Sequence, residues 1–213
     1  DHRGLLLSDD ILFEISDGIA RVTITRPEAR NATSAEMLYA LTDFLRQVEQ
    51  DPEARCVLIT AKGDHFMAGG DVKGFQEALA MSPQERRADF EGRVHRANPL
   101  FLTMERMPQP VIVAVRGFAA GSAVSFVAGA DLAIASDTAQ FLLAHVHLGM
   151  PPDAGSTWIL PRTVGLKKAK QMAFLGERIN AQDALAMGMV NWVVPDAELD
   201  AKAEEIARRI AAG

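Results

Sequence analysis

Two glycine-rich turns determine the predicted fold of this chain: His65-Phe66-Met67-Ala68-Gly69-Gly70-Asp71 and Arg116-Gly117-Phe118-Ala119-Ala120-Gly121-Ser122-Ala123. Each follows an apolar run rich in β-branched residues (57–60 and 111–115), and each opens a segment with helical character. A strand that turns through glycines into a helix leaves backbone N–H groups unpaired at the positive end of the helix dipole. Two such ends that converge on one point would form an oxyanion hole, which stabilises negative charge on a carbonyl oxygen.

Composition predicts one globular domain over residues 1–213, with a core at about 11–195 and a C-terminal helix at about 196–212. The net charge of −6 argues against a nucleic-acid surface but permits a local anion site. Cys56 is the single cysteine, which excludes an intrachain disulfide and is expected to be a buried core thiol. Residues 138–152 form the longest uncharged stretch, which is shorter than the roughly 20 residues of a membrane span. Residues 1–4 lack the apolar core of a secretion signal, so we expect a cytoplasmic protein without membrane partners.

Local patterns predict alternating strands and helices, which is typical of an α/β fold. Residues 11–15 and 19–25 alternate around Asp17-Gly18, which predicts a hairpin. Thr33 followed by Glu36 predicts a capping box for the next helix. The polar stretch 75–105 is expected to be solvated or mobile. The remaining expected elements are strands at 132–135 and 141–144, helices that begin at Ser156, Leu166 and Ala181, and an Ala-rich helix at 198–212.

The segments that flank the turns resemble the signatures of the crotonase (enoyl-CoA hydratase/isomerase) superfamily. Residues 66–71 are similar to its F-x-A-G-x-D turn, and residues 110–121 are similar to its second signature. The resemblance extends from about Phe13 to Pro195 and also includes 26–32, Leu148-Gly149, Leu160-Pro161-Arg162 and Val164-Gly165. It implies a spiral of repeated ββα units and a homotrimer or a dimer of trimers. The helices that follow this region in the family and support trimers are missing from the sequence.

The resemblance also implies a set of ligand-binding residues. Gly70 and Ser122 match the two oxyanion-hole donors, and a serine in place of the usual glycine keeps the backbone N–H. The substrate would be an acyl-CoA thioester, bound without a metal or a redox cofactor. The positions that match the family's substrate-binding and CoA-binding segments are Arg26, Arg30, Ala68, Gly70, Asp71, Val72, Lys73 and Ser122. The basic residues of this set are alternatively ordinary surface charges.

The acid–base positions depart from the hydratases of the family. Hydratases use two glutamates, and the matching residues here are Ser125 and His145. A serine hydroxyl cannot replace a carboxylate base near neutral pH, so hydration by paired glutamates is disfavoured. Asp153 matches a catalytic aspartate of some isomerases of the family, where one carboxylate in an apolar pocket moves a proton along the acyl chain. The alternative role for Asp153 is a helix N-cap.

His145 is the second acid–base candidate, and it lies two residues before His147, so both would share a face of a strand. We predict an enoyl-CoA isomerase in which Asp153 shuttles the proton and His145 assists. An enoyl-CoA hydratase remains open, as does a thioester or β-diketone hydrolase that combines Ser125 or water with His145 and Asp153. A dehalogenase would use Asp153 as nucleophile and need a histidine at position 98, where the chain has asparagine; His95 lies three residues away. The last alternative is a non-catalytic acyl-CoA binder.

Overall fold

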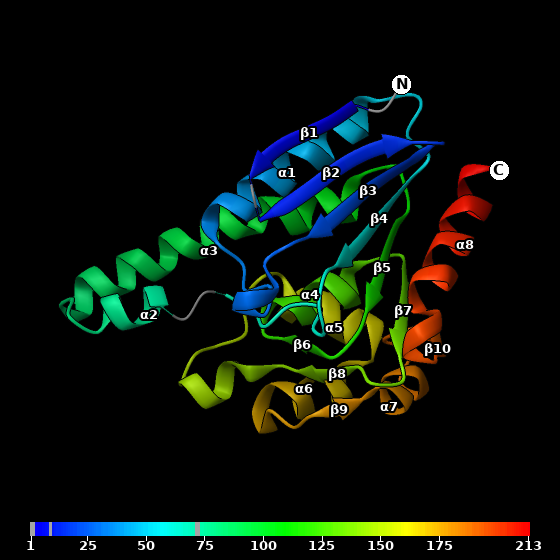
Figure 1. Cartoon of the computed structure of the whole chain (residues 1–213). Helices are drawn as coiled ribbons and strands as arrows, with labels where there is room; N and C mark the ends of the chain where they lie inside the picture. The colour runs from blue at the N-terminus through cyan, green and yellow to red at the C-terminus, as the bar shows by residue number, and fades with distance from the viewer. Residues whose placement is uncertain (1–2, 9, 71–72) are drawn as a thin grey trace.

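The computed structural model describes residues 3–8, 10–70 and 73–213, and it describes side chains over 10–70 and 76–213. Within these residues a seven-stranded sheet with strand order β1-β2-β3-β4-β5-β7-β10 forms the centre of the molecule (Figure 1). The strands are β1 (Arg3–Ser8), β2 (Ile11–Ser16), β3 (Ile19–Ile24), β4 (Cys56–Ala61), β5 (Val111–Val115), β7 (Leu132–Ser136) and β10 (Trp192–Val194). The sheet is antiparallel from β1 to β3 and parallel from β3 to β10.

The predicted hairpin joins β2 and β3. Asp17 and Gly18 both have positive φ angles, 52° and 76°, as a two-residue hairpin turn requires. Ser16 pairs with Ile19 directly across the turn. The hairpin prediction is therefore confirmed.

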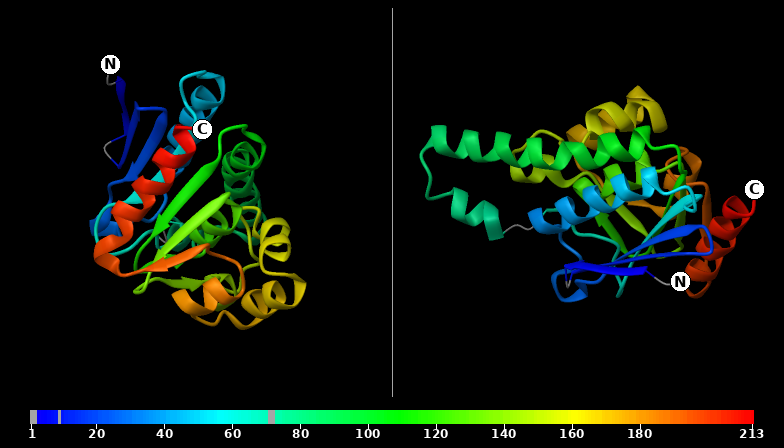
Figure 2. Two further views of the ribbon diagram at one scale, coloured as in Figure 1. Left: turned by 90° about the vertical axis from the view of Figure 1, so that its right-hand side faces the viewer. Right: turned by 90° about the horizontal axis from the view of Figure 1, so that it is seen from above.

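Helices cover both faces of the sheet (Figure 2). A smaller sheet of β6 (Phe118–Ala120), β8 (Gln140–Leu142) and β9 (Ile179–Asn180) lies beside the main one. The α-helices are α1 (Ala35–Gln50), α2 (Lys73–Ala78), α3 (Pro83–Arg106), α4 (Ser122–Gly129), α5 (Ser156–Thr163), α6 (Leu166–Leu175), α7 (Ala181–Ala186) and α8 (Leu199–Ala211). Three short 3₁₀ turns, η1 (Pro27–Ala29), η2 (Ala144–Leu148) and η3 (Asp196–Glu198), complete the described elements.

Strand β4 shows how the core divides into two layers. Val57 and Ile59 pack into the cluster that includes α1, α3 and α4, whereas Cys56 and Leu58 pack into the cluster under α8. Because both faces are buried, the strand is apolar throughout rather than alternating. Burial raises the pKa of the Cys56 thiol to about 11, in agreement with the predicted core thiol.

Helix α8 is also held to the sheet by an ion pair. Arg21 on β3 contacts Glu204 on α8 at 2.7 Å. This contact, mainly through the hydrogen bond, lowers the pKa of the Glu204 carboxyl. The predicted C-terminal helix is therefore confirmed and packs on the sheet.

Two local predictions are wrong. Ser34, not Thr33, caps α1, since the Ser34 hydroxyl accepts a hydrogen bond from Met37 N–H at 3.1 Å. Thr33 N–H instead donates to the carbonyl oxygen of Gly69 at 2.8 Å. The strand expected at 141–144 ends at Leu142 and passes into η2.

The polar stretch 75–105 forms parts of α2 and α3, and its apolar residues Leu100, Phe101 and Met104 are buried. The helices expected from Ser156 and Leu166 begin where they were predicted. None of the helices in the described residues combines the length and apolar composition that a membrane span needs.

Candidate active site

The two glycine-rich turns lie side by side, joined by backbone hydrogen bonds. Phe66 N–H donates to Arg116 O at 2.9 Å, and Met67 N–H donates to Phe118 O at 3.0 Å. In return, Ala120 N–H donates to Met67 O at 2.9 Å. The convergence that an oxyanion hole needs is thus present in the backbone.

Gly69 permits this close approach. A Cβ atom at this position would lie 2.9 Å from the carbonyl oxygen of Ala120, and the φ angle of +90° favours glycine. On the opposite turn, a Cβ on Gly121 would lie 3.7 Å from the Cα of Gly69. The two turns therefore contact each other through backbone atoms.

The candidate donors Gly70 and Ser122 line one cavity. Ser122 is the first residue of α4, so its N–H has no partner within the helix. Its backbone is not among the positive-φ residues, and the Cβ that replaces the usual glycine is accommodated without strain. Its hydroxyl oxygen is buried and has no hydrogen-bond partner among the described residues.

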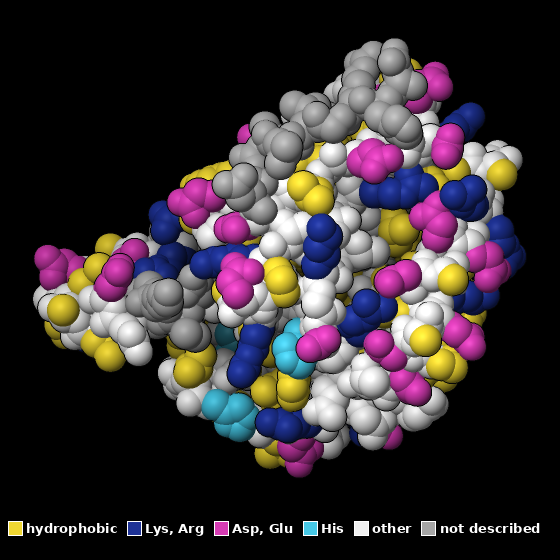
Figure 3. All heavy atoms as spheres, viewed as in Figure 1, with side chains coloured by type: hydrophobic (Ala, Val, Ile, Leu, Met, Phe, Trp, Pro, Cys, Tyr) yellow, Lys and Arg dark blue, Asp and Glu magenta, His cyan; other side chains and the backbone are white. Residues whose placement is uncertain are grey.

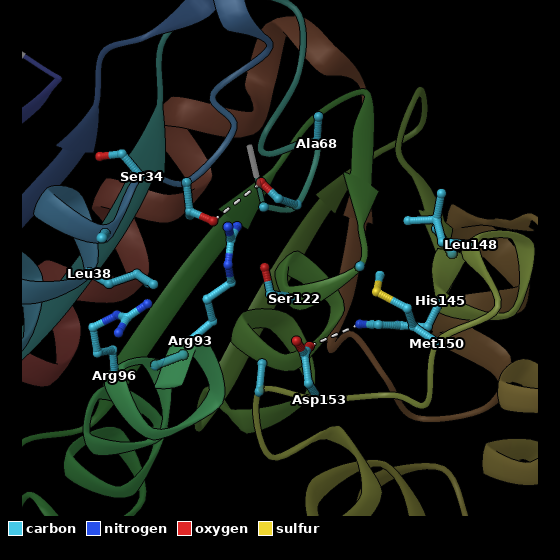
Figure 4. A pocket seen from close by; sticks show the side chains of 18 of the residues that line it. Ser34, Leu38, Ala68, Arg93, Arg96, Ser122, His145, Leu148, Met150 and Asp153 are labelled. Carbon is cyan, nitrogen blue, oxygen red and sulfur yellow. Dashed lines mark hydrogen bonds and ion pairs between the residues drawn. The ribbon is translucent and has the colours of Figure 1, made fainter. Parts of the chain in front are cut away.

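The cavity has a volume of about 570 Å³ (Figure 4). Its lining residues fall within the segments 33–38, 68–70, 93–101, 121–122 and 144–154, together with Glu77. Leu38, Phe101, Leu148 and Met150 give part of the wall an apolar character. The cavity is thus lined by the two turns, the start of α1, the middle of α3 and the segment after β8.

His145 and Asp153 form the central polar pair of this cavity. His145 Nε2 lies 2.9 Å from Asp153 Oδ1, as the dashed line in Figure 4 marks. The side chain of His145 is 7% exposed and that of Asp153 is 40% exposed. His145 Nδ1 is buried without a partner among the described residues. An ionised carboxylate accepts only, so Nε2 carries the proton of this hydrogen bond.

The backbone around Asp153 directs its side chain into the cavity. Ala154 and Gly155 both have positive φ angles, 52° and 74°, before α5 begins. The carbonyl oxygen of Asp153 accepts hydrogen bonds from Ser156 N–H at 2.9 Å and from the Ser156 hydroxyl at 2.7 Å. Gly155 is the N-cap of α5 and Asp153 makes no side-chain cap, so the structure does not support the capping alternative.

Several sequence candidates lie away from this cavity. Ser125 is fully buried in α4, outside the lining residues, and its hydroxyl has no partner among the described residues. Arg26 contacts the carbonyl oxygen of Ala32 at 3.1 Å, and Arg30 accepts a hydrogen bond from Ala68 N–H at 3.0 Å through its carbonyl oxygen. Neither arginine lines the cavity, whereas Ala68 does.

Three further candidates lie wholly or partly outside the described residues. Asp71 and Val72 are not described, and Lys73 is described only as the first residue of α2, without its side chain. Their predicted contacts with CoA stay predictions.

The predicted common face of His145 and His147 is wrong because the segment is a 3₁₀ turn rather than a strand. His145 is buried at the cavity, whereas His147 Nε2 lies 2.8 Å from the carbonyl oxygen of Gly176. His95 is exposed, and neither His95 nor Asn98 lines the cavity. Among the described residues, no group of three or more His, Cys, Asp and Glu side chains is arranged to hold a metal ion.

Sequence reasoning missed the contribution of α3. Arg93, Arg96, Ala97 and Phe101 line the cavity from this helix. Their spacing of three and four residues is the helical period, which places them on one face. This period was available in the sequence, but the charges beside it made the stretch resemble a solvated surface.

Comparisons with known proteins identify the family of the chain. The sequence model of the family described as enoyl-CoA hydratase/isomerase matches residues 14–213. The chain is 38% identical to 1,2-epoxyphenylacetyl-CoA isomerase of Escherichia coli, over 94% of this chain and 76% of that protein. It is 36% identical to short-chain-enoyl-CoA hydratase of Clostridium acetobutylicum, over 95% of this chain and 75% of that protein.

Solved structures give the same result. An enoyl-CoA hydratase from Mycobacterium avium subsp. paratuberculosis superposes with a TM-score of 0.87 at 31% identity, covering 98% of this chain and 81% of the other. Enoyl-CoA hydratase from Bacillus anthracis superposes with a TM-score of 0.86 at 32% identity, covering 96% and 78%. Sequence and structure together show that the chain belongs to the enoyl-CoA hydratase/isomerase family.

Proposed function

We propose that the protein is an enoyl-CoA isomerase that moves a double bond along the acyl chain of a CoA thioester. The observation that carries this proposal is the Asp153 carboxylate, hydrogen-bonded to His145 in the cavity that the two glycine-rich turns line. Asp153 lines the cavity with Gly70 and Ser122, whereas the second glutamate position of the hydratases holds His145 and the first holds the buried Ser125. One base that removes a proton and returns it elsewhere is sufficient for isomerisation.

In the proposed reaction, backbone N–H groups stabilise the negative charge on the thioester oxygen, and the side chain of Asp153 carries the proton. The thioester carbonyl accepts hydrogen bonds from the N–H groups of Gly70 and Ser122. Asp153 takes a proton from carbon 2 of a 3-enoyl thioester, and the electron pair of that C–H bond enters a conjugated dienolate. The dienolate then recovers the proton at carbon 4, which leaves the double bond between carbons 2 and 3. No atom is gained or lost, and no cofactor is needed.

His145 acts in this scheme as a positioning residue. Its Nε2 holds Asp153 Oδ1 at 2.9 Å, which leaves Oδ2 for the substrate. Because His145 is buried, its ring cannot rotate freely and the carboxylate keeps one orientation. The hydrolase alternative needs His145 to activate water through its other nitrogen. That nitrogen, Nδ1, is buried, which favours isomerisation over hydrolysis.

Product analysis in deuterated water tests the proposal. The protein is incubated with trans-2-, trans-3- and 2,4-enoyl-CoA, and the products are examined by mass spectrometry. Deuterium in a product with a moved double bond and no added oxygen is the expected result. A product that is heavier by one water, with CoA attached, would identify a hydratase. Release of free CoA would identify a hydrolase, and unchanged thioesters that still bind would indicate either a non-catalytic binder or an enzyme for another acyl class.

A further inference from the structure

Helix α3 brings two arginines to the wall of the cavity. The helix spans Pro83–Arg106, its N-cap Ser82 forms a capping box with Glu85, and Pro99 lies within its C-terminal part. Arg93 and Arg96 are three residues apart, so they lie on the same face of the helix. Both line the cavity, and neither belongs to the two turns or to the acid–base pair.

The Arg93 side chain is oriented by its own helix. Its Nε donates to Asp89 Oδ2 at 2.7 Å, one turn earlier, and the two side chains are 31% and 25% exposed. This contact engages the inner nitrogen of the guanidinium. Figure 4 shows the outer end of the group directed into the cavity. The arginine is therefore positioned before any ligand binds.

Arg96 supplies the second cationic group. Figure 4 shows its guanidinium beside Leu38, at the same cavity. No described carboxylate lies within ion-pair distance of Arg96. Arg93 already has Asp89 as a counter-charge, so Arg96 is the cation of this pair that lacks one among the described carboxylates.

The wall of the cavity carries negative as well as positive side chains, so an anion would bind only beside the two arginines. Glu36 of α1 and Glu77 of α2 also line the cavity. On the face of the molecule in Figure 3, basic and acidic side chains are interspersed in the same way. Recognition of an anion here therefore rests on guanidinium geometry, since planar guanidinium groups match a carboxylate with paired hydrogen bonds.

We propose that Arg93 and Arg96 bind a carboxylate at the far end of the acyl group, so that the substrate is the CoA thioester of an unsaturated dicarboxylic acid. The proposal rests on the proposed function for the acyl-CoA nature of the substrate and for its double bond. Leu38 and Phe101 pack along the hydrocarbon part of the chain, and the arginines receive its charged end. The phosphate groups of CoA offer the same anionic chemistry, and the experiment separates these two sources.

Calorimetric binding of saturated thioesters tests the proposal without any turnover. Succinyl-, glutaryl- and adipoyl-CoA are compared with butyryl-, pentanoyl- and hexanoyl-CoA of matched length, and with free CoA. We expect at least one carboxylated thioester to bind more tightly than its matched partner. Arg96→Gln and Arg93→Gln should each weaken that binding by about 10- to 100-fold, the range for a hydrogen bond to a charged group. Binding of free CoA and of the unsubstituted thioesters should change less than about threefold.

Arg87→Gln is the matched control. Arg87 lies on the same helix, pairs with Glu91 at 2.8 Å, and does not line the cavity. This variant should bind every ligand as the unaltered protein does. Equal binding of each matched pair by the unaltered protein would overturn the proposal. An equal loss for free CoA in Arg96→Gln would also overturn it, because it would assign the arginines to the CoA phosphates. A failure of the isomerase proposal would be seen separately, as absent double-bond migration with binding intact.

Discussion

Replacement of Asp153 by asparagine separates proton transfer from every other property of the cavity. Asparagine has nearly the shape of aspartate. Its amide oxygen can still accept the hydrogen bond from His145 Nε2, which in the unaltered protein joins Nε2 to Asp153 Oδ1 over 2.9 Å. The variant thus keeps the contact with His145 and the volume of the cavity. It loses the negative charge and the ability to take a proton from carbon.

The expected loss of kcat follows from the contribution that a positioned base makes to catalysis. General acid–base catalysis contributes about 10²- to 10⁴-fold, so Asp153→Asn should lower kcat for double-bond migration by at least about 100-fold. This loss corresponds to about 3 kcal/mol or more of transition-state stabilisation. Affinity for hexanoyl-CoA, which cannot isomerise, should change by less than about threefold because no contact to the thioester is removed.

The assay combines deuterium incorporation with two histidine variants. His145→Ala should lower kcat by about tenfold, since it removes a hydrogen bond that orients the carboxylate but leaves the base in place. His95→Ala should have no effect, because His95 is exposed and does not line the cavity. The reasoning would be refuted if Asp153→Asn kept full activity while His145→Ala lost it, since the base would then be His145.

Three further predictions concern the backbone donor, the thiol and the ion pair. Ser122 is the first residue of α4, where proline is tolerated. Ser122→Pro removes the N–H and should lower kcat by about 10²- to 10³-fold in a steady-state assay. Ser122→Ala keeps the N–H, so its kcat should stay within about threefold of that of the unaltered protein. Cys56 has a pKa of about 11 and is buried, so iodoacetamide at pH 8 should label it only after unfolding, as mass spectrometry of the intact protein would show. The pKa of Glu204 is lowered by Arg21, so the stabilisation is present above the unfolded-state pKa and is lost as pH falls through the lower folded-state value. Glu204→Gln should therefore reduce the free energy of unfolding by up to about 1 kcal/mol at pH 7, and the difference should vanish in acid. Urea titration at pH 7 and in acid measures this difference, and a difference that does not change with pH would contradict the prediction.

Most of the fold could be predicted because local and tertiary preferences agree. The turn at Asp17-Gly18 needs positive φ angles, and its residue types supply them wherever the chain places it. The cap of α1 was misassigned because Thr33 and Ser34 are both good caps locally. What decides between them is the pairing of Thr33 with Gly69, 36 residues away, and no local pattern contains this contact.

The site could be predicted only where backbone geometry dictates it. Two glycine turns after parallel strands converge regardless of other side chains, and this brings Gly70 and Ser122 to one cavity. The placement of Arg93 could not be predicted in the same way, because a helix with charges on several faces gives no sign of which face meets a cavity. Ser125 was predicted as catalytic from its alignment alone, and its burial inside α4 depends on packing against neighbouring elements.

This division between backbone and side chains explains how one scaffold serves different reactions. The proposed oxyanion donors are main-chain N–H groups, so a serine at position 122 keeps the donor that a glycine would supply. The acid–base groups are side chains, and each replacement changes the chemistry available. With a buried serine at 125 and a histidine at 145, neither of these two positions carries a carboxylate, and Asp153 supplies one that is hydrogen-bonded to that histidine. In the proposed reaction the main-chain N–H groups polarise the thioester, and these three side chains favour the movement of a proton over the addition of water.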